Sequence, residues 1–248
     1  MKKRPILSLL CLAFISLIAC GQKKETAPSS EQEKNKVTMA SETTGSMVET
    51  QTSMTTEGGA SSEGSTKAHF NGSYYSIQGK YGEVIIVNKK HPLSASYAPG
   101  ENPVALAAFW QLHAAMRGAG FDVSNQYSGF RSYETQAGLY NNYVASDGKE
   151  NADRYSARPG YSEHQTGLAF DLIDSSGALL TEPNAANWLA QNAHHYGFIV
   201  RYLEEKEGIT GYMAETWHIR YIGEEATDIY KSGLTLEEYY GIDGGGYE

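Results

Sequence analysis

The sequence predicts an α+β fold with a small, mostly antiparallel sheet and flanking helices. Two local patterns and their order along the chain support this prediction. The run Glu83 to Val87 is rich in β-branched residues, which favour a strand. The segment 103–117 instead repeats its apolar residues at helical spacing. Predicted strands and helices do not alternate regularly, so a doubly wound parallel sheet is not expected.

Turn and cap residues mark the ends of the predicted elements. Pro92 follows the first strand closely, and Gly118 follows the first helix. Ser132 is a candidate N-cap for a second helix. Thr235 and Glu238 match a capping box, which opens a last helix. In chain order, the elements expected before the last helix are strand 83–87, helix 103–117, helix 132–146, strand 167–173, helix 181–196 and strands 198–200 and 217–222.

Composition excludes several classes of protein and several kinds of chemistry. The chain has 248 residues, of which 40% are hydrophobic and 20% charged, as is typical of a globular protein. Its formal net charge is −9, whereas nucleic-acid-binding domains normally have a basic surplus, so we expect no nucleic-acid partner. The two cysteines, Cys11 and Cys20, both precede the predicted domain. We therefore expect no disulfide, no Cys-ligated zinc and no cysteine nucleophile in the folded part.

The first twenty residues predict export and lipidation. Three basic residues at positions 2–4 precede a 14-residue run, Ile6 to Ala19, that is apolar except for two serines. This run is too short to span a bilayer and has the flanks of a secretory signal. It ends in Leu-Ile-Ala-Cys-Gly, which resembles a bacterial lipobox with Cys20 as the lipidated residue. We therefore expect residues 1–19 to be a lipoprotein signal peptide and the mature protein to be tethered at the extracellular face of the bacterial membrane.

Residues 20–68 predict a solvated spacer. After Cys20 this segment contains no Leu, Ile or aromatic residue, and Ser and Thr are its commonest residues. Such a segment cannot bury enough apolar surface to offset its chain entropy, so we expect it to be disordered. Nearly all the aromatic residues follow within 69–248, which is long enough for one well-packed catalytic domain. We expect this domain to be monomeric.

Two segments carry residues suited to metal chemistry. The first, SEHQTGLAFD, contains His164 in a turn-like stretch and Asp171 in the strand that follows. The second, ETWHIRY, contains Glu215 and His218. Two histidines and a carboxylate can hold a catalytic zinc, which keeps its fourth position for water, and Glu215 would be the general base. On a regular strand Glu215 and His218 face opposite ways, so the chain is expected to bend between them.

Strand alternation predicts open space beside Asp171. A strand over 167–173 would place Asp171 on the same face as Gly167 and Ala169, whose side chains are absent or small. A cavity is therefore expected beside the carboxylate. The other face has three larger apolar residues, which are expected to pack in the core: Leu168, Phe170 and Leu172.

These segments resemble the signatures of the zinc D,D- and L,D-carboxypeptidases of bacterial cell walls, the VanY and DacB/LdcB type. That family has the pattern Ser-x-His-x-x-Gly-x-Ala-x-Asp followed by Glu-x-x-His, which the sequence matches at 162–171 and 215–218. A third segment, SGFRSYETQ at 128–136, matches the family's Ser-Gly-aromatic-Arg-Ser stretch. The resemblance covers about residues 83–239. With its lipoprotein signal and spacer, the chain is most similar to streptococcal-type L,D-carboxypeptidases.

The resemblance implies a zinc-dependent L,D-carboxypeptidase that removes the terminal D-Ala from peptidoglycan tetrapeptide stems. Zn²⁺ would be held by His164, Asp171 and His218. Glu215 would take a proton from the attacking water and pass it to the leaving amine. Arg131 would bind a substrate carboxylate through its planar fork, in a pocket suited to one small terminal residue. The other implied pocket residues are Gln136, Ser162 and Trp217, with Tyr133 and Tyr202 as further candidates.

Three alternatives stay open at this point. A D,D-carboxypeptidase for pentapeptide stems would use the same metal site and differ in the residue accepted before the scissile bond. A non-catalytic cell-wall-binding lipoprotein would have the same fold but no need for a base at Glu215. A serine peptidase is suggested weakly by Ser146 with Lys149 and by the sequence KSG at 231–233, but the Ser-x-Asn motif between them is missing.

Overall fold

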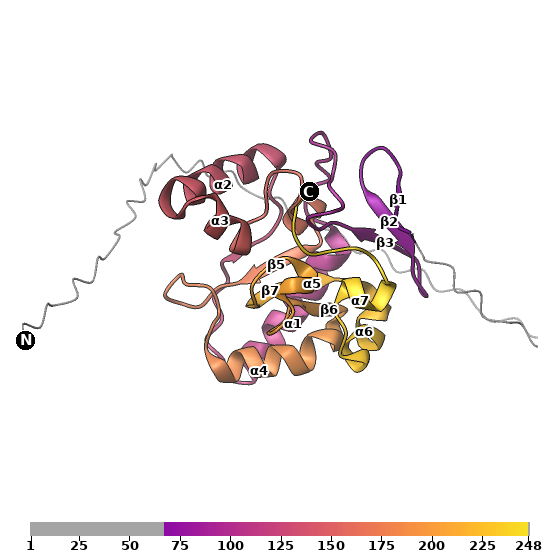
Figure 1. Cartoon of the computed structure of the whole chain (residues 1–248). Helices are drawn as coiled ribbons and strands as arrows, with labels where there is room; N and C mark the ends of the chain where they lie inside the picture. Colours follow the sequence, from indigo (N-terminus) through magenta and orange to yellow (C-terminus); the bar gives the residue numbers. More distant parts are fainter. Residues whose placement is uncertain (1–66, 248) are drawn as a thin grey trace, which may run out of the picture. The chain divides into compact units, whose positions relative to one another are not determined.

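The computed structural model describes residues 67–247 (Figure 1). The predicted signal peptide, the predicted lipidation site at Cys20 and nearly all of the predicted spacer lie outside the described residues. Across 67–247, no helix is long and apolar enough to cross a bilayer. The described part combines helices with antiparallel sheets, which confirms the predicted α+β class.

Two antiparallel sheets, rather than the single one expected, organise the described chain. The first has the strand order β1-β2-β3, and the second has the order β4-β5-β7-β6. The sequence pattern did not predict β1 and β2, because these strands are short and largely solvent-accessible and so lack a long apolar alternation. The strand bounds are β1 His69–Phe70, β2 Tyr75–Gln78, β3 Glu83–Ile86, β4 Tyr127–Ser128, β5 Ala169–Leu172, β6 Phe198–Tyr202 and β7 Glu215–Tyr221.

Helices surround the four-stranded sheet, and the predicted caps form. The Ser132 hydroxyl accepts a hydrogen bond from the backbone of Thr135, and Thr235 and Glu238 form the reciprocal capping box. The predicted helix at 181–196 is shorter, because its last turn tightens into a 3-10 helix. The helix bounds are α1 Pro103–Gly118, α2 Tyr133–Asp147, α3 Lys149–Tyr155, α4 Pro183–Asn192, α5 Glu207–Thr210, α6 Ala226–Ser232 and α7 Leu236–Tyr240, with 3-10 helices η1 Glu163–Thr166, η2 Ala193–Tyr196 and η3 Gly223–Glu225.

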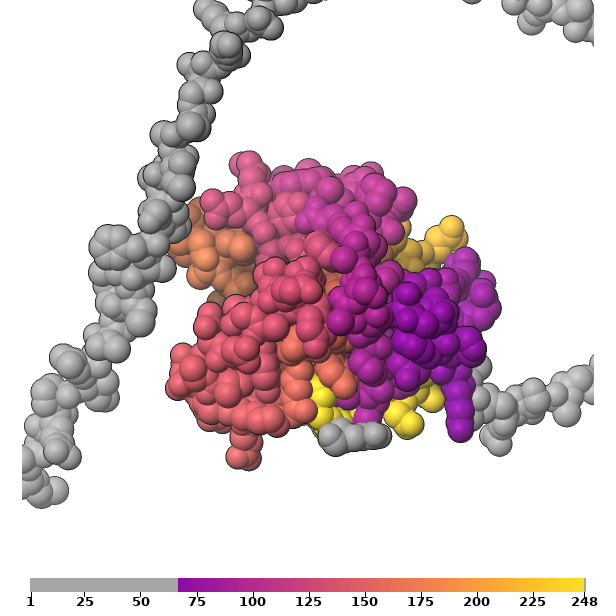
Figure 2. Space-filling model, turned by 90° about the horizontal axis from the view of Figure 1, so that it is seen from above, coloured from indigo at the N-terminus to yellow at the C-terminus, as the bar shows by residue number. Residues whose placement is uncertain are grey.

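Two apolar cores hold these layers together. In the larger core, α1 and α4 pack against the four-stranded sheet, and the Phe109 ring stacks on Phe170 at a centroid distance of 4.9 Å. In the smaller core, the three-stranded sheet packs against α6 and α7, together with Ile199 of β6. Helices α2 and α3 lie to one side of the face shown in Figure 2, and the segment 67–100 lies to the other. Strand β6 contributes residues to both cores and so joins them.

Gly167 ends η1 and packs it against the chain that precedes α1. Its φ of 70° lies in the left-handed region that favours glycine. A Cβ added here would lie 2.0 Å from the carbonyl oxygen of Gly100, far inside van der Waals contact. The backbone N–H of Asn102 also donates to the Gly167 carbonyl at 3.0 Å. The strand β5 begins only at Ala169, so Gly167 does not lie on the strand face that the alternating pattern predicted for it. It is part of a tight contact between two backbone segments.

We expect Gly167→Ala to lower the free energy of unfolding by more than the roughly 1–2 kcal/mol that a left-handed backbone costs an ordinary residue. The reason is that the added methyl group must also displace the Gly100 carbonyl. Gly177→Ala is a matched control, since its φ is 86° but nothing lies within 4 Å of an added Cβ. Urea denaturation of the two variants makes the comparison. Equal losses would mean that the contact with Gly100 has no energetic weight.

Candidate active site

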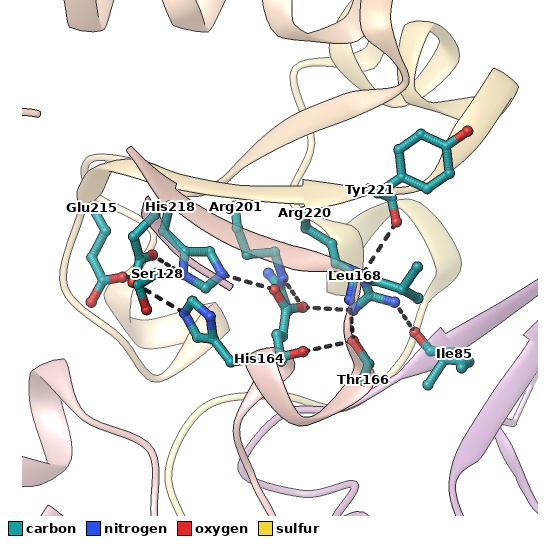
Figure 3. Close-up of polar contacts among 12 residues, drawn as sticks. Ile85, Ser128, His164, Thr166, Leu168, Arg201, Glu215, His218, Arg220 and Tyr221 are labelled. Carbon is teal, nitrogen blue, oxygen red and sulfur yellow. Dashed lines mark hydrogen bonds and ion pairs between the residues drawn. The ribbon is translucent and has the colours of Figure 1, made fainter. Parts of the chain in front are cut away.

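The central strand pair of the four-stranded sheet brings two predicted metal ligands together. Strands β5 and β7 pair antiparallel, with Asp171 directly opposite His218. His164 reaches the same point from η1, the element that precedes β5. The imidazole rings of His164 and His218 and the side chain of Glu215 lie around one point (Figure 3). One ligand atom from each of the two histidines and Asp171 lies within 4.8 Å of the others.

The two histidines present different ring nitrogens to the site. His164 Nε2 lies 3.2 Å from Asp171 Oδ2, and His218 Nδ1 lies 3.0 Å from Asp171 Oδ1. The other nitrogen of each ring has a partner on the far side. His164 Nδ1 is 2.8 Å from the Gly129 carbonyl oxygen, and His218 Nε2 is 3.1 Å from Glu163 Oε2. Histidines that bind metals are typically held in this way through their second nitrogen.

Burial and neighbouring charges determine the protonation of this cluster. Burial disfavours the charged form of Asp171, but His164 and His218 hold the pKa of this carboxyl well below its usual range. Burial lowers the pKa of His164. Burial also opposes the charge on His218, yet hydrogen bonds to Asp171 and Glu163 raise the pKa of His218 to about 9. Burial thus favours the neutral form of His164, whereas the carboxylates beside His218 favour positive charge on that ring.

A bulge in β7 provides the bend expected between Glu215 and His218. Val200 pairs with Ile219 and Tyr202 pairs with Glu215, so β7 has two more residues than β6 between these pairs. The extra residues turn Glu215 back toward the cluster, with its Oε2 3.7 Å from His218 Nδ1. Bulges commonly re-aim a side chain beside an active site.

Glu215 has the properties of a general base. Burial raises the pKa of its carboxyl to about 7, with nearby Asp171 adding to the effect while His218 opposes it. A carboxylate with a pKa near neutrality accepts and returns a proton more readily at physiological pH than an ordinary glutamate does. Its position next to the predicted metal ligands matches the role that the sequence motif implied.

Arg131 enters the site from the loop between β4 and α2. Its Nη1 donates to Gln136 Oε1 at 2.9 Å, and its Nη2 lies 3.4 Å from both Ser128 Oγ and Asp171 Oδ2. The contacts at 3.4 Å are long for hydrogen bonds, so Nη2 keeps donor capacity for a substrate. Gln136 Nε2 donates in turn to the Ala157 carbonyl at 2.6 Å, which fixes the pair against the neighbouring wall.

A cavity of about 660 Å³ opens beside the cluster and contains most of the predicted site. It is lined by the three predicted metal ligands, by Glu215 and by five predicted pocket residues: Arg131, Gln136, Ser162, Tyr202 and Trp217. Tyr133 does not line it, and its ring lies instead beside Gly160. Residues three apart on a helix differ in direction by about 60°, which is enough to turn Tyr133 away from the face of Gln136.

The cavity is larger than a pocket for one small terminal residue. Its volume falls in the range of roughly 300–1,000 Å³ that is usual for small-molecule sites. The lining that the sequence did not indicate combines Glu163 and small residues with larger aromatic and apolar ones, so the cavity has room for more of an extended substrate. The larger ones are Leu139, Tyr143, Tyr155, Leu179, Tyr212 and Met213.

Lys89 ties two walls of this cavity together. Its Nζ donates to the Asp153 carbonyl of α3 at 2.5 Å and also to the carbonyl of Gly211, which precedes β7. The same ammonium group lies over the ring of Tyr212, 4.3 Å from its centroid. Tyr212 lines the cavity, and so does Tyr155, which follows Asp153 in α3. The aromatic lining is therefore held by contacts outside it.

Comparison with known proteins identifies the family to which the chain belongs. The family model of VanY, D-alanyl-D-alanine carboxypeptidase, matches residues 101–224, which is half of the chain and includes every predicted metal, base and pocket residue. The chain belongs to the VanY family. The resemblance inferred from the motifs is thereby confirmed, and the protein is a carboxypeptidase.

Solved structures of this family superimpose on the chain. The L,D-carboxypeptidase DacB of Streptococcus pneumoniae is 62% identical with a TM-score of 0.72, covering 73% of this chain and 98% of DacB. VanYB, solved in complex with D-alanine-D-alanine, is 34% identical with a TM-score of 0.57, covering 63% of this chain and 96% of its own. A D-alanyl-D-alanine carboxypeptidase of Enterococcus faecalis is 37% identical over 175 residues, which are 63% of this chain and 65% of the relative. This chain thus spans just under two thirds of the enterococcal protein.

The structure adds buried charges that the motifs did not indicate. Glu163, Arg201 and Arg220 are each about 1% exposed at the side chain and form an ion-pair cluster behind His218. A signal for one of them exists in the sequence, since Arg201 is the single charged residue of the otherwise apolar and aromatic strand FIVRY. A buried cation requires a buried anion, so this strand implied an acidic partner without identifying it.

Residues proposed for rival chemistries lie elsewhere. Ser146 is exposed near the end of α2, and the segment 231–233 lies at the end of α6, and neither lines the cavity. Two further histidines have partners away from the cavity: His113 contacts the Ser124 carbonyl and His194 contacts the Thr227 hydroxyl. In the described chain, the only cluster suited to a metal is the predicted one.

The raised pKa of Glu215 predicts a pH-dependent effect of Glu215→Gln on the stability of the metal-free protein. A carboxyl whose pKa is higher in the folded than in the unfolded state destabilises the fold increasingly as pH rises from about 4.5 to about 7. The free energy of unfolding of the variant should therefore exceed that of the wild type by a margin that grows by about 1.4 kcal/mol per pH unit in this window. Above the window the margin should level off. Urea unfolding in chelator at pH 5, 6, 7 and 8 measures it. An advantage that does not change with pH would contradict burial as the cause.

Proposed function

We propose that the protein is a zinc-dependent L,D-carboxypeptidase that releases the terminal D-Ala from tetrapeptide stems of peptidoglycan. The observation that carries this proposal is the convergence of His164, Asp171 and His218 on one point, with Glu215 beside them. The preference for L,D over D,D specificity is supported by the greater identity to DacB, 62%, than to VanYB, 34%.

The donor set fits Zn²⁺. Two imidazole nitrogens and one carboxylate oxygen are the ligands of many catalytic zinc sites, and they leave one position open. All three residues are buried, and the ring nitrogens that face the site are already oriented. VanY from the VanB-type resistance cassette has been solved in complex with Zn(II) and is 35% identical to this chain. Bound zinc would polarise the scissile carbonyl and lower the pKa of a water molecule.

The chain's own residues supply the proton transfer and the substrate contacts. Glu215 would accept the proton of the attacking water and return it to the leaving amine, since its carboxylate lies beside the predicted ligands and its pKa is near neutrality. Arg131 would bind the terminal carboxylate through the Nη2 donor that has only long contacts. Gln136 would hold the Arg131 fork in place through its hydrogen bond to Nη1. A fixed cation at this point favours removal of a terminal residue over cleavage within a chain.

The sequence supports membrane tethering as a further part of the proposal. The basic start, the short apolar run and the Leu-Ile-Ala-Cys ending lead us to propose that the mature chain begins at a lipidated Cys20 on the extracellular face of the membrane. We expect the mass of the N-terminal peptide from the membrane fraction to include acyl chains on Cys20. A Cys20→Ala variant should be released from that fraction, and retention of the variant would contradict the proposed anchor.

The substrate is tested with defined stem peptides. We expect the purified protein to release D-Ala rapidly from a tetrapeptide stem and slowly from a pentapeptide stem, as followed by mass spectrometry of the products. Glu215→Gln is the matched control and should lower turnover of either substrate by roughly 100- to 10,000-fold, because it removes the base but keeps the shape. Rapid trimming of the pentapeptide with an untouched tetrapeptide would replace the L,D assignment with the D,D alternative. Turnover of neither stem would favour the wall-binding alternative.

The role of Arg131 is tested by Arg131→Lys. This change keeps the positive charge but removes the planar fork, so we expect a lower kcat/KM on stems that end in a free carboxylate. A stem whose terminal carboxylate is amidated provides the comparison, because its binding should depend little on the fork. If the variant loses the same factor in kcat/KM on the amidated stem as on the free stem, Arg131 does not act through the carboxylate.

A further inference from the structure

Glu163 is a buried carboxylate that contacts the metal cluster only from behind. Its side chain is 1% exposed, and its Oε2 lies 3.1 Å from His218 Nε2. Its Oε1 accepts from Arg201 Nε at 2.8 Å and from Arg220 Nη1 at 3.0 Å. In Figure 3 dashed contacts link the ring of His218, through one carboxylate, to Arg201 and Arg220. Neither the sequence motif nor the proposed proton transfer assigns Glu163 a task.

The acceptor at Nε2 determines which nitrogen of His218 can bind a metal. His218 can bind a metal through Nδ1 only when its ring proton is on Nε2, and the Glu163 carboxylate, which accepts hydrogen bonds but donates none, stabilises the proton there. Nδ1 is the nitrogen that faces Asp171 at 3.0 Å. For His164 the corresponding acceptor is the backbone carbonyl of Gly129, which lies beside Nδ1. Of the two histidines, only His218 therefore depends on a side chain for its tautomer.

The two arginines hold the Glu163 carboxylate in place. Both guanidinium groups donate to the same oxygen, Oε1, which leaves Oε2 for His218. Arg201 also forms two hydrogen bonds to Glu237, at 2.9 and 2.6 Å. The charges of these two arginines and two glutamates sum to zero, which makes their burial tolerable. Glu163 is thereby fixed from β6 and β7, the strands that carry Arg201 and Arg220.

We propose that Glu163 is the positioning residue of the metal site, which holds His218 in the orientation and tautomer that direct Nδ1 to the metal. The Arg201–Arg220 pair keeps the Glu163 carboxylate fixed for this task. The inference rests on the proposed metal ligands but concerns a residue that would act through His218 and not as a ligand itself.

Glu163→Gln tests the proposal. The amide has a single oxygen, which should face the two arginine donors and leave its NH₂ group toward His218 Nε2. Nε2 must then accept, so the ring proton moves to Nδ1 and competes with the metal. We expect zinc affinity, measured by titrating metal-free protein against a chelator of known affinity, to fall about 10- to 100-fold. In the zinc-loaded variant, the NMR signal of the hydrogen-bonded His218 Nε2 proton should shift or disappear.

Glu237→Gln is the matched control. Glu237 is also 1% exposed and also pairs with Arg201, but it has no contact with His218. We expect it to lower the melting temperature and to leave zinc affinity within about threefold of the wild type. An unchanged zinc affinity in Glu163→Gln, or an equal loss in both variants, would reduce Glu163 to a general structural role and overturn the proposal.

A rebalanced variant covers the case in which Glu163→Gln does not fold. Adding Arg220→Met removes one buried cation and restores charge balance, and Arg220→Met alone is the reference for zinc affinity. The same 10- to 100-fold difference is expected between these two proteins. Wild-type protein that binds no zinc would contradict the proposed metal site itself, whereas zinc binding that is indifferent to Glu163 would contradict only the positioning role.

Discussion

The site depends on the register of one strand pair, β5 with β7, which places Asp171 opposite His218. Side chains of directly opposed residues share a face with their Cβ atoms about 4.5–5.5 Å apart, so the two side chains can reach one point. A shift of one residue would turn one of the two side chains to the opposite face of the sheet. The adjacent pair protects the register, since Phe170 and Ile219 are fully buried in the larger core. The core therefore stabilises the fold and aligns the cluster at once.

Buried charge is the second constraint on this architecture. The ion-pair cluster joins His218 to β6, β7 and α7 through side chains with almost no solvent contact. Such clusters contribute little net stability compared with apolar packing, but breaking one partner leaves an uncompensated charge in the interior. The cluster thus leaves few alternative arrangements for the ring of His218. Functional groups held by strands and by such contacts are positioned more accurately than groups on free loops.

The metal cluster and the cavity wall have different consequences for function. L,D- and D,D-carboxypeptidases hydrolyse the same kind of bond, so the ligands and the base can be common to both. They differ in the configuration of the residue before that bond, which is sensed by the surfaces around it. In this protein the wall contains Tyr143, Tyr155 and Met213, beyond the residues of the family motifs. In this protein the choice between the two configurations is therefore expected to depend on this wall and on the contacts that hold it.

The sequence by itself determined the chemistry of the site and the class of the fold. The spacing of His164, Asp171, Glu215 and His218 and the cap residues are local properties, and local properties can be inferred without knowing what packs against them. The position of Gly167, the direction of Tyr133 and the size of the cavity depend on contacts with distant segments. The partner of His218 is the plainest case, because Glu163 in η1 meets Arg201 of β6 and Arg220 of β7 only in the folded chain. Only the tertiary structure decides such contacts. A buried charge needs partners that are close in space, and these partners come from segments that are far apart in the sequence.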